Sequence, residues 1–106
     1  MNIVLVRHGN TFEKEEAARF IGFRTDLPLT VYGKKQALSA ARFLESEKLI
    51  PQVVFYGPIL RQRETAEIIV QALGLNRRCL RQDASLAEID YGAWEGLTEE
   101  EVKKDW

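Results

Sequence analysis

Short apolar runs alternate with helical patterns along this chain, and the alternation restricts the fold to few classes. Ile3–Val6 is an unbroken, mostly β-branched run, and Val53–Tyr56 is a second run of the same kind. Such runs are typical of strands that are buried on both faces of a parallel sheet. A weaker third strand is expected around Cys79–Leu80.

Two segments between these runs carry the three- to four-residue apolar spacing of helices. The first helix is expected to end before Pro51, and the second to run from about Arg61 to a stop at Gly74. Their apolar faces comprise Ala37, Leu38, Ala41 and Leu44 in the first helix, and Thr65, Ala66, Ile69, Ala72 and Leu73 in the second.

This order of elements predicts right-handed crossovers and a mainly parallel sheet in a three-layer α/β/α architecture. Near the end of the sequence, Thr98 followed by Glu101 forms a capping box, which opens a further helix. A chain of 106 residues is short for a doubly wound fold. We expect a single domain over residues 1–106 whose C-terminal part is missing from this sequence. The alternatives are a naturally short form and a chain that completes its core with a partner.

Composition excludes several classes of function. The formal net charge is -1, from 15 basic and 16 acidic residues, so no basic field favours nucleic acid or an anionic membrane. Cys79 is the single cysteine and no Cys/His cluster has metal-ligand spacing, which favours a reducing cytoplasm without a structural metal. The N-terminal apolar run is too short for a signal peptide or a membrane span.

A candidate site follows the first apolar run. His8, flanked by Arg7 and Gly9, is expected at the carboxyl edge of the sheet, where open α/β folds bind ligands. Gly9 allows close approach of the backbone to an anion, Thr11 offers a hydroxyl donor, and the Arg7 guanidinium matches two phosphate oxygens. A neutral imidazole can attack phosphorus through one nitrogen while a carbonyl holds the other. A structural histidine at a strand end is the alternative.

Four motifs occur in order along the chain, and together they resemble those of the histidine phosphatase superfamily, which includes cofactor-dependent phosphoglycerate mutases. Val6–Thr11 resembles the RHG-x-T signature, and Phe23–Thr30 with Gly33, Gln36 and Ala37 resembles the family's TD-x-PLT stretch. Pro58–Ala66 is similar to its PL-x-RA-xx-TA element, and Leu86–Leu97 to the element that ends in WEG. The ordered set is far more specific than any single short motif.

The resemblance implies a role for each matching residue. His8 would be the phosphorylated nucleophile, Arg7 and Arg61 would clamp the transferring phosphoryl group, and Glu88 would be the proton donor. The residues expected to contact substrate are Gly9, Asn10, Thr11 and Arg24. Asp90 and Glu95 are expected to serve in hydrogen bonding or capping, and Tyr91 and Trp94 in packing or as a pocket wall.

The sequence departs from the family pattern in three places. Asn10 stands where Glu or Gln is common, and Tyr56-Gly57 replaces a pair of small hydroxyl residues. The family also has a second histidine beyond the glutamate motif, whereas His8 is the only histidine here. We therefore expect little or no hydrolysis of p-nitrophenyl phosphate by a chain that ends at Trp106.

The function expected from the resemblance is a phosphatase that acts on a small phosphorylated metabolite through a phosphohistidine. A cofactor-dependent phosphoglycerate mutase is one alternative, and a non-catalytic phosphate-binding pseudoenzyme or fragment is another. No metal or organic cofactor, nucleic acid or membrane partner is expected, and the location is expected to be cytoplasmic. A homo-oligomer and a complementing chain both remain open, as does the identity of the substrate.

Overall fold

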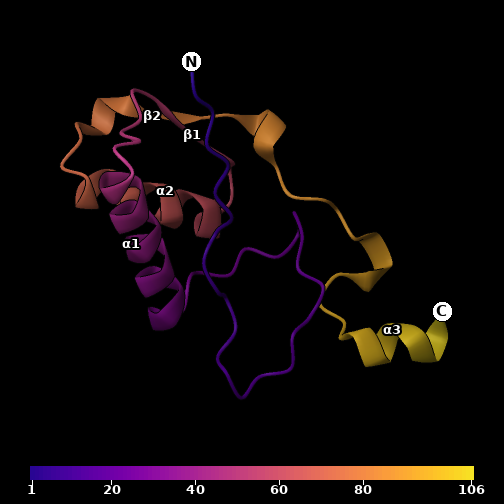
Figure 1. Ribbon diagram of the computed structural model, residues 1–106. Helices are drawn as coiled ribbons and strands as arrows, with labels where there is room; N and C mark the ends of the chain where they lie inside the picture. Colours follow the sequence, from indigo (N-terminus) through magenta and orange to yellow (C-terminus); the bar gives the residue numbers. More distant parts are fainter.

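Two packed helices and a two-stranded parallel sheet form one end of the molecule, and looped segments together with the C-terminal helix form the other (Figure 1). The structure is a computed structural model that describes residues 1–106. The regular elements are α1 (Val31–Ser46), β1 (Val54–Tyr56), α2 (Leu60–Ala72), β2 (Leu80–Gln82) and α3 (Glu99–Asp105), with short 3-10 turns at Arg77–Cys79, Ala84–Leu86 and Gly92–Trp94. None of the helices has the length and apolar character needed to cross a bilayer.

The sheet confirms the expected parallel crossover. β1 and β2 pair in parallel, with Val54 opposite Leu80 and Tyr56 opposite Gln82, and α2 is the helix that connects them. The second and third predicted strands and both predicted helices are therefore present. Gly74, with φ of 66°, ends α2 as expected, because glycine adopts this left-handed conformation without the steric penalty of a side chain.

The core lies between α1 and α2. Ala41 and Leu44 of α1 pack against Ile69 of α2, and all three are buried. Leu38, which the helical spacing places on the same face as Ala41, is exposed and is not part of this cluster. Only 15 of the 106 residues are buried, so the apolar core of the chain is small.

The prediction of a buried strand at Ile3–Val6 was wrong for this chain. The segment forms no strand and makes no backbone hydrogen bond to β1. Ile3 and Leu5 are 78% and 92% exposed. A buried strand needs sheet neighbours and covering layers, and within residues 1–106 the only sheet is the pair β1 and β2.

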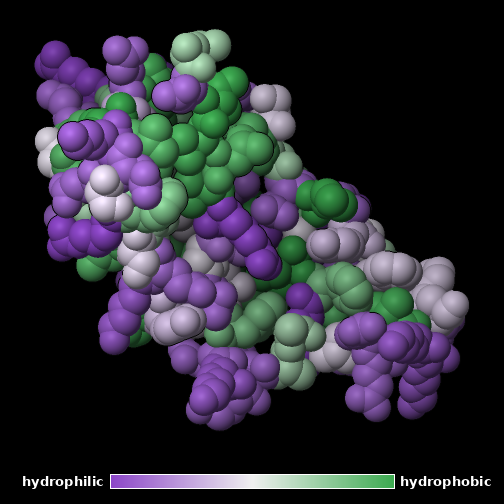
Figure 2. Space-filling model, viewed as in Figure 1, coloured by the Kyte–Doolittle hydropathy of each residue, from purple (hydrophilic) through white to green (hydrophobic).

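An apolar face results from this arrangement. Residues 1–8 and 48–57 line one broad groove together with parts of α2. Figure 2 shows hydrophobic residues gathered on the part of the surface where the N-terminal segment and β1 lie in Figure 1. Phe55 of β1 is 60% exposed there.

The predicted capping box is present at the start of α3. The Thr98 hydroxyl accepts a hydrogen bond from the backbone N–H of Glu101, and the Glu101 carboxylate accepts one from the backbone N–H of Thr98. Arg19 forms an isolated antiparallel bridge with Thr98, and its guanidinium bonds to Glu101. These contacts attach α3 to the loop that follows the Arg-His-Gly motif.

Gly33, in the first turn of α1, yields a test of the fold. A Cβ atom added to Gly33 would lie 2.2 Å from the carbonyl oxygen of Asn10, so the helix and the loop at Asn10 are in backbone contact. We expect Gly33→Ala to lower the free energy of unfolding by about 1–3 kcal/mol through overpacking, although alanine favours an ordinary helix. Urea unfolding measures the change. The exposed Ser39→Ala in the same helix is the control and should be neutral or slightly stabilising; an equal result for both variants would contradict the contact.

Candidate functional site

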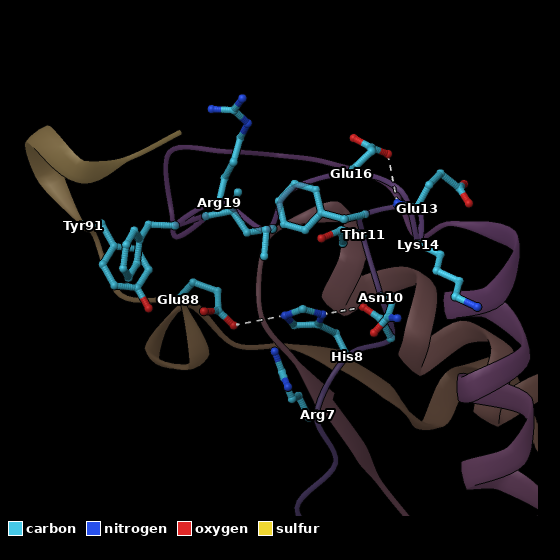
Figure 3. A pocket seen from close by; sticks show the side chains of 15 residues that line it. Arg7, His8, Asn10, Thr11, Glu13, Lys14, Glu16, Arg19, Glu88 and Tyr91 are labelled. Carbon is cyan, nitrogen blue, oxygen red and sulfur yellow. Dashed lines mark hydrogen bonds and ion pairs between the residues drawn. The ribbon is translucent and has the colours of Figure 1, made fainter. Parts of the chain in front are cut away.

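His8 lies in the loop after the extended N-terminal segment, and its two ring nitrogens face different partners (Figure 3). Nδ1 lies 2.7 Å from the carbonyl oxygen of Gly9. Because a carbonyl oxygen can only accept, Nδ1 carries the proton in this hydrogen bond, and the neutral ring has its free electron pair on Nε2. Nε2 lies 3.9 Å from Oε1 of Glu88. The ring therefore presents an electron pair towards a carboxyl group.

The helices α1 and α2 both hold the backbone beside His8. The N–H of Asn10 donates to Oε1 of Gln36 in α1 at 2.7 Å, and the N–H of Gly9 donates to the hydroxyl of Thr65 in α2 at 3.4 Å. A Cβ atom on Gly9 would come within 2.2 Å of the carbonyl oxygen of Gly33 in α1, so only glycine allows this approach. His8 is positioned by the helical core even though the segment before it is exposed.

Glu88 reaches His8 from a distant part of the sequence. It follows the 3-10 turn Ala84–Leu86, and the Gln62 side chain of α2 donates a hydrogen bond to the carbonyl oxygen of Leu86 at 2.9 Å. The side chains of His8 and Glu88 are 15% and 28% exposed, respectively. Both are shielded on most sides but remain open to a ligand.

An open cavity of about 590 Å³ lies over these two side chains (Figure 3). Most residues of the loop 7–21 line it, together with Glu88 and Tyr91. The predicted residues at the cavity are Arg7, His8, Gly9, Asn10, Thr11, Glu88 and the expected pocket-wall residue Tyr91. The sequence did not indicate the contribution of Phe12 to Ile21, because this stretch has no periodic pattern; its only signal is that it follows the Arg-His-Gly motif directly.

Arg7 is the cation beside the His8 ring in the cavity. Figure 3 shows its guanidinium beside the His8 ring, on the side that Glu88 also occupies. Arg7 is exposed and makes no side-chain hydrogen bond or ion pair within residues 1–106. A guanidinium with free donors next to an electron-rich nitrogen suits the binding of a phosphate or carboxylate group.

Arg61 lies outside the cavity lining and is completely buried at the start of α2. Its Nη1 and Nη2 atoms donate to the carbonyl oxygens of Thr25 and Gly22 at 2.6 and 3.0 Å, whereas Nε has no partner. Burial lowers the pKa of Arg61, and the negative charge of Glu88 is the largest opposing influence. The structure therefore uses two of the three guanidinium nitrogens to hold a neighbouring turn.

A carboxylate of the chain itself binds the start of α2. The carboxylate of Asp26 accepts a hydrogen bond from the backbone N–H of Leu60 at 2.7 Å. A carboxylate at this position interacts favourably with the helix dipole and satisfies an N–H group that has no partner within the helix. Asp26 therefore supplies a negative charge at the start of α2, where the cation Arg61 alone would oppose the helix dipole.

Arg24 also lies away from the cavity lining. Its Nε atom donates to Asp90, and this ion pair is exposed, with 62% and 44% of the two side chains accessible. Asp90 in addition accepts a hydrogen bond from the N–H of Gly92. The hydrogen-bonding part expected for Asp90 is therefore present, and Arg24 is engaged in the same loop contact.

Glu95 accepts three hydrogen bonds near the site. Its Oε1 atom accepts hydrogen bonds from the N–H of Gly22 and the hydroxyl of Thr25, both at 2.7 Å, and Oε2 accepts one from the N–H of Tyr91 at 3.2 Å. Partial burial would raise the pKa of Glu95, but these hydrogen bonds outweigh burial and hold the pKa below its ordinary value. The hydrogen-bonding part predicted for Glu95 is present.

The lowered pKa of Glu95 makes stability depend on pH. A carboxyl whose pKa is lower in the folded state stabilises the fold fully above its unfolded pKa of about 4.3, and this contribution is lost as the pH falls through the lower folded value. We expect Glu95→Gln to reduce the fall in unfolding free energy between about pH 5 and pH 3, as measured by urea titration at each pH. Asp83, Asp90 and Glu101, whose pKa values hydrogen bonds also lower, leave the variant some pH dependence. Identical pH profiles would contradict the role of Glu95.

Within residues 1–106, no three or more histidine, cysteine or carboxylate side chains gather in an arrangement that could hold a metal ion.

Comparison with known proteins identifies relatives over almost the whole chain. A model of the histidine phosphatase superfamily (branch 1) matches residues 3–106. The chain is 32% identical over 104 residues to a 2,3-bisphosphoglycerate-dependent phosphoglycerate mutase of Nitrobacter winogradskyi, covering 98% of this chain and 49% of the mutase. It is 34% identical over 107 residues to sedoheptulose 1,7-bisphosphatase of Saccharomyces cerevisiae, covering 93% of this chain and 39% of that protein.

A solved structure agrees with these matches. Mycobacterial glucosyl-3-phosphoglycerate phosphatase aligns with 92% of this chain and 42% of its own, at a TM-score of 0.76 and 30% identity. The likeness confirms the predicted α/β fold class. The chain spans about half the length of the curated relatives it matches, or less.

Proposed function

Because this chain belongs to the histidine phosphatase superfamily, we propose that it supplies the nucleophile of a phosphomonoester phosphatase, with Nε2 of His8 as the attacking atom. The arrangement of the His8 ring carries the proposal: Nδ1 is bound to the carbonyl of Gly9, and Nε2 faces Glu88. Since the chain spans about half the length of its curated relatives, the activity is proposed for the whole protein.

In the first step, the electron pair of His8 Nε2 attacks phosphorus, and the bond between phosphorus and the ester oxygen breaks. The Glu88 carboxyl group gives its proton to the departing oxygen, and the product leaves as an alcohol. The Nδ1 proton stays in its hydrogen bond to the carbonyl of Gly9, and this bond stabilises the positive ring that forms. The product of the step is a phosphohistidine.

In the second step, water attacks the phosphorus atom of the phosphohistidine. The Glu88 carboxylate takes a proton from this water, so that Glu88 returns to its protonated form. The bond between phosphorus and Nε2 breaks, and its electron pair returns to the His8 ring. Inorganic phosphate leaves, and the enzyme is ready for another substrate.

Donors around the cavity would bind the transferring group. Arg7 offers two parallel N–H groups to two phosphate oxygens, and the Gly9, Asn10 and Thr11 loop borders the same space. Arg61 is completely buried and outside the cavity lining, so the clamp that the family resemblance implies would require Arg61 to leave its position in this structure. Contact between Arg24 and substrate would require Arg24 to leave Asp90.

The test is the release of inorganic phosphate from small phosphomonoesters such as 3-phosphoglycerate and p-nitrophenyl phosphate. The proposal expects phosphate release that does not depend on an added acceptor. A protein that binds phosphate but releases none from any monoester would support the pseudoenzyme alternative.

A phosphoglycerate mutase is the second candidate, because several of the similar curated proteins carry that name. In a mutase, the phosphohistidine would return its group to a bound acceptor instead of water. Incubation with 3-phosphoglycerate and a trace of bisphosphoglycerate distinguishes the two activities. Formation of 2-phosphoglycerate without free phosphate would favour the mutase. The substrate class proposed here is a small phosphorylated metabolite, and a cytoplasmic location stays a prediction.

A further inference from the structure

The turn Gly22–Thr25 is held from two sides by side chains of opposite charge. Arg61 donates to the carbonyl oxygens of Thr25 and Gly22. Glu95 accepts from the N–H of Gly22 and from the hydroxyl of Thr25, both at 2.7 Å. Hydrogen bonds to ionised groups are stronger than those between neutral groups, so four such bonds fix this turn firmly.

The same carboxylate also fixes the segment that carries Glu88. Through Oε2, Glu95 accepts a hydrogen bond from the N–H of Tyr91. The N–H of Phe23 donates to the carbonyl oxygen of Ile89, the residue after Glu88, at 2.9 Å. A Cβ atom on Gly22 would lie 1.9 Å from that carbonyl oxygen, so the two backbones are in direct contact. The position of Glu88 thus follows from the position of the turn.

The helix α2 places both partners of the His8–Glu88 pair. Thr65 of α2 donates to the carbonyl oxygen of Arg61 and accepts from the N–H of Gly9, next to His8. Arg61 of the same helix holds the turn to which the Glu88 segment is attached. The hydrogen bonds of Glu95, together with the backbone hydrogen bond from Phe23 to Ile89, connect this turn to the segment that carries Glu88.

An ion pair also joins the same two loops but contributes less to holding them. The ion pair between Arg24 and Asp90 is exposed on both sides, and exposed ion pairs contribute little to structure. Glu95 is partly buried and makes three hydrogen bonds, whereas Asp90 is open to solvent. The two carboxylates therefore form a matched pair for experiment.

We propose that Glu95 is a positioning residue that holds the Glu88 carboxyl group against Nε2 of His8 by fastening the segment 88–95 to the Gly22–Thr25 turn. The proposal rests on the proposed function only for its catalytic consequence. Its structural part concerns the distance between two side chains and can be measured without turnover.

The first experiment observes the ring of His8 by NMR. In the whole protein labelled with ¹⁵N and ¹³C in histidine, the ring signals of His8 are identified as those that disappear in His8→Ala. Glu88→Gln defines the change caused by losing the facing carboxyl group. We expect Glu95→Ala to move the signals in the same direction, Glu95→Gln to move them less because its amide oxygen can still accept, and Asp90→Asn to leave them in place.

The second experiment compares leaving groups. We expect Glu95→Ala to lower kcat/KM about tenfold to a hundredfold for an alkyl phosphate, whose departing oxygen needs a proton, and much less for p-nitrophenyl phosphate. Asp90→Asn should change neither value by more than about twofold, as expected for an exposed pair. A purely structural loss would lower both substrates equally.

Unchanged His8 signals in folded Glu95→Ala would overturn the proposal, and so would unchanged signals in Glu88→Gln. If Glu95→Ala does not fold, Thr25→Val, which removes one donor to Glu95, replaces it and must shift the signals in the same direction. If the wild-type protein has no phosphatase activity, the proposed function is contradicted but the positioning role of Glu95 is not. The His8 signals then still test that role.

Discussion

His8→Ala is expected to abolish phosphoryl transfer, with a loss in kcat of at least about 10⁴-fold for every phosphomonoester that the wild-type protein hydrolyses. The reason is chemical, because alanine has no ring nitrogen that could accept the phosphoryl group. Phosphate release under saturating substrate measures the effect. The activity that remains would come only from binding of the substrate beside Arg7 and the neighbouring donors.

The fold should survive this substitution. The His8 side chain makes a single hydrogen bond, to the carbonyl oxygen of Gly9, so we expect a loss of about 0.5–1.5 kcal/mol in the free energy of unfolding. Urea unfolding and binding of inorganic phosphate are the controls. A folded His8→Ala variant that keeps more than a tenth of the wild-type rate would exclude covalent catalysis through His8.

Glu88→Gln is expected to lower kcat/KM by about 10²- to 10⁴-fold for alkyl phosphates, because the amide cannot give a proton to the departing oxygen. The loss should be far smaller for p-nitrophenyl phosphate, whose product leaves as a stable anion. The ratio kcat/KM is informative here because it reports the first transfer and not the later hydrolysis of the phosphohistidine.

Asp90→Asn is the matched control for Glu88→Gln, since it removes a carboxylate two residues away that faces Arg24 and not His8. Its effect on both kinds of substrate should be small. Equal losses for alkyl and aryl phosphates in Glu88→Gln would show that Glu88 binds or positions the substrate instead of protonating the leaving group.

The sequence predicted those parts of the fold that depend on local pattern. The apolar stripe of α1 apart from Leu38, the stop at Gly74 and the capping box at Thr98 match the structure, because each is determined by a few neighbouring residues. The pattern of Ile3–Val6 failed as a guide, because the burial of a strand depends on layers that lie on both of its faces. Residues 1–106 provide no such layers around this segment.

The residues proposed to react were predictable from the sequence, but their supporting contacts were not. The motifs brought His8, Glu88 and Arg7 to one cavity, as the resemblance implied. The burial of Arg61 against the carbonyl oxygens of Gly22 and Thr25 had no signal in the sequence, because backbone acceptors carry no side-chain identity. The loop from Phe12 to Ile21 lacks periodicity, so its place over the cavity emerges only in three dimensions.

The central claim is that phosphate is carried on one nitrogen of one residue, and a trapped intermediate tests it directly. The whole protein is mixed with a phosphomonoester, denatured in alkali within its first turnovers, digested, and analysed by mass spectrometry and ³¹P NMR. The account predicts a phosphoryl group that is stable in alkali and labile in acid, on the peptide that contains His8 and attached to Nε2. Phosphate on Nδ1, on another residue, or on no residue during active turnover would contradict it.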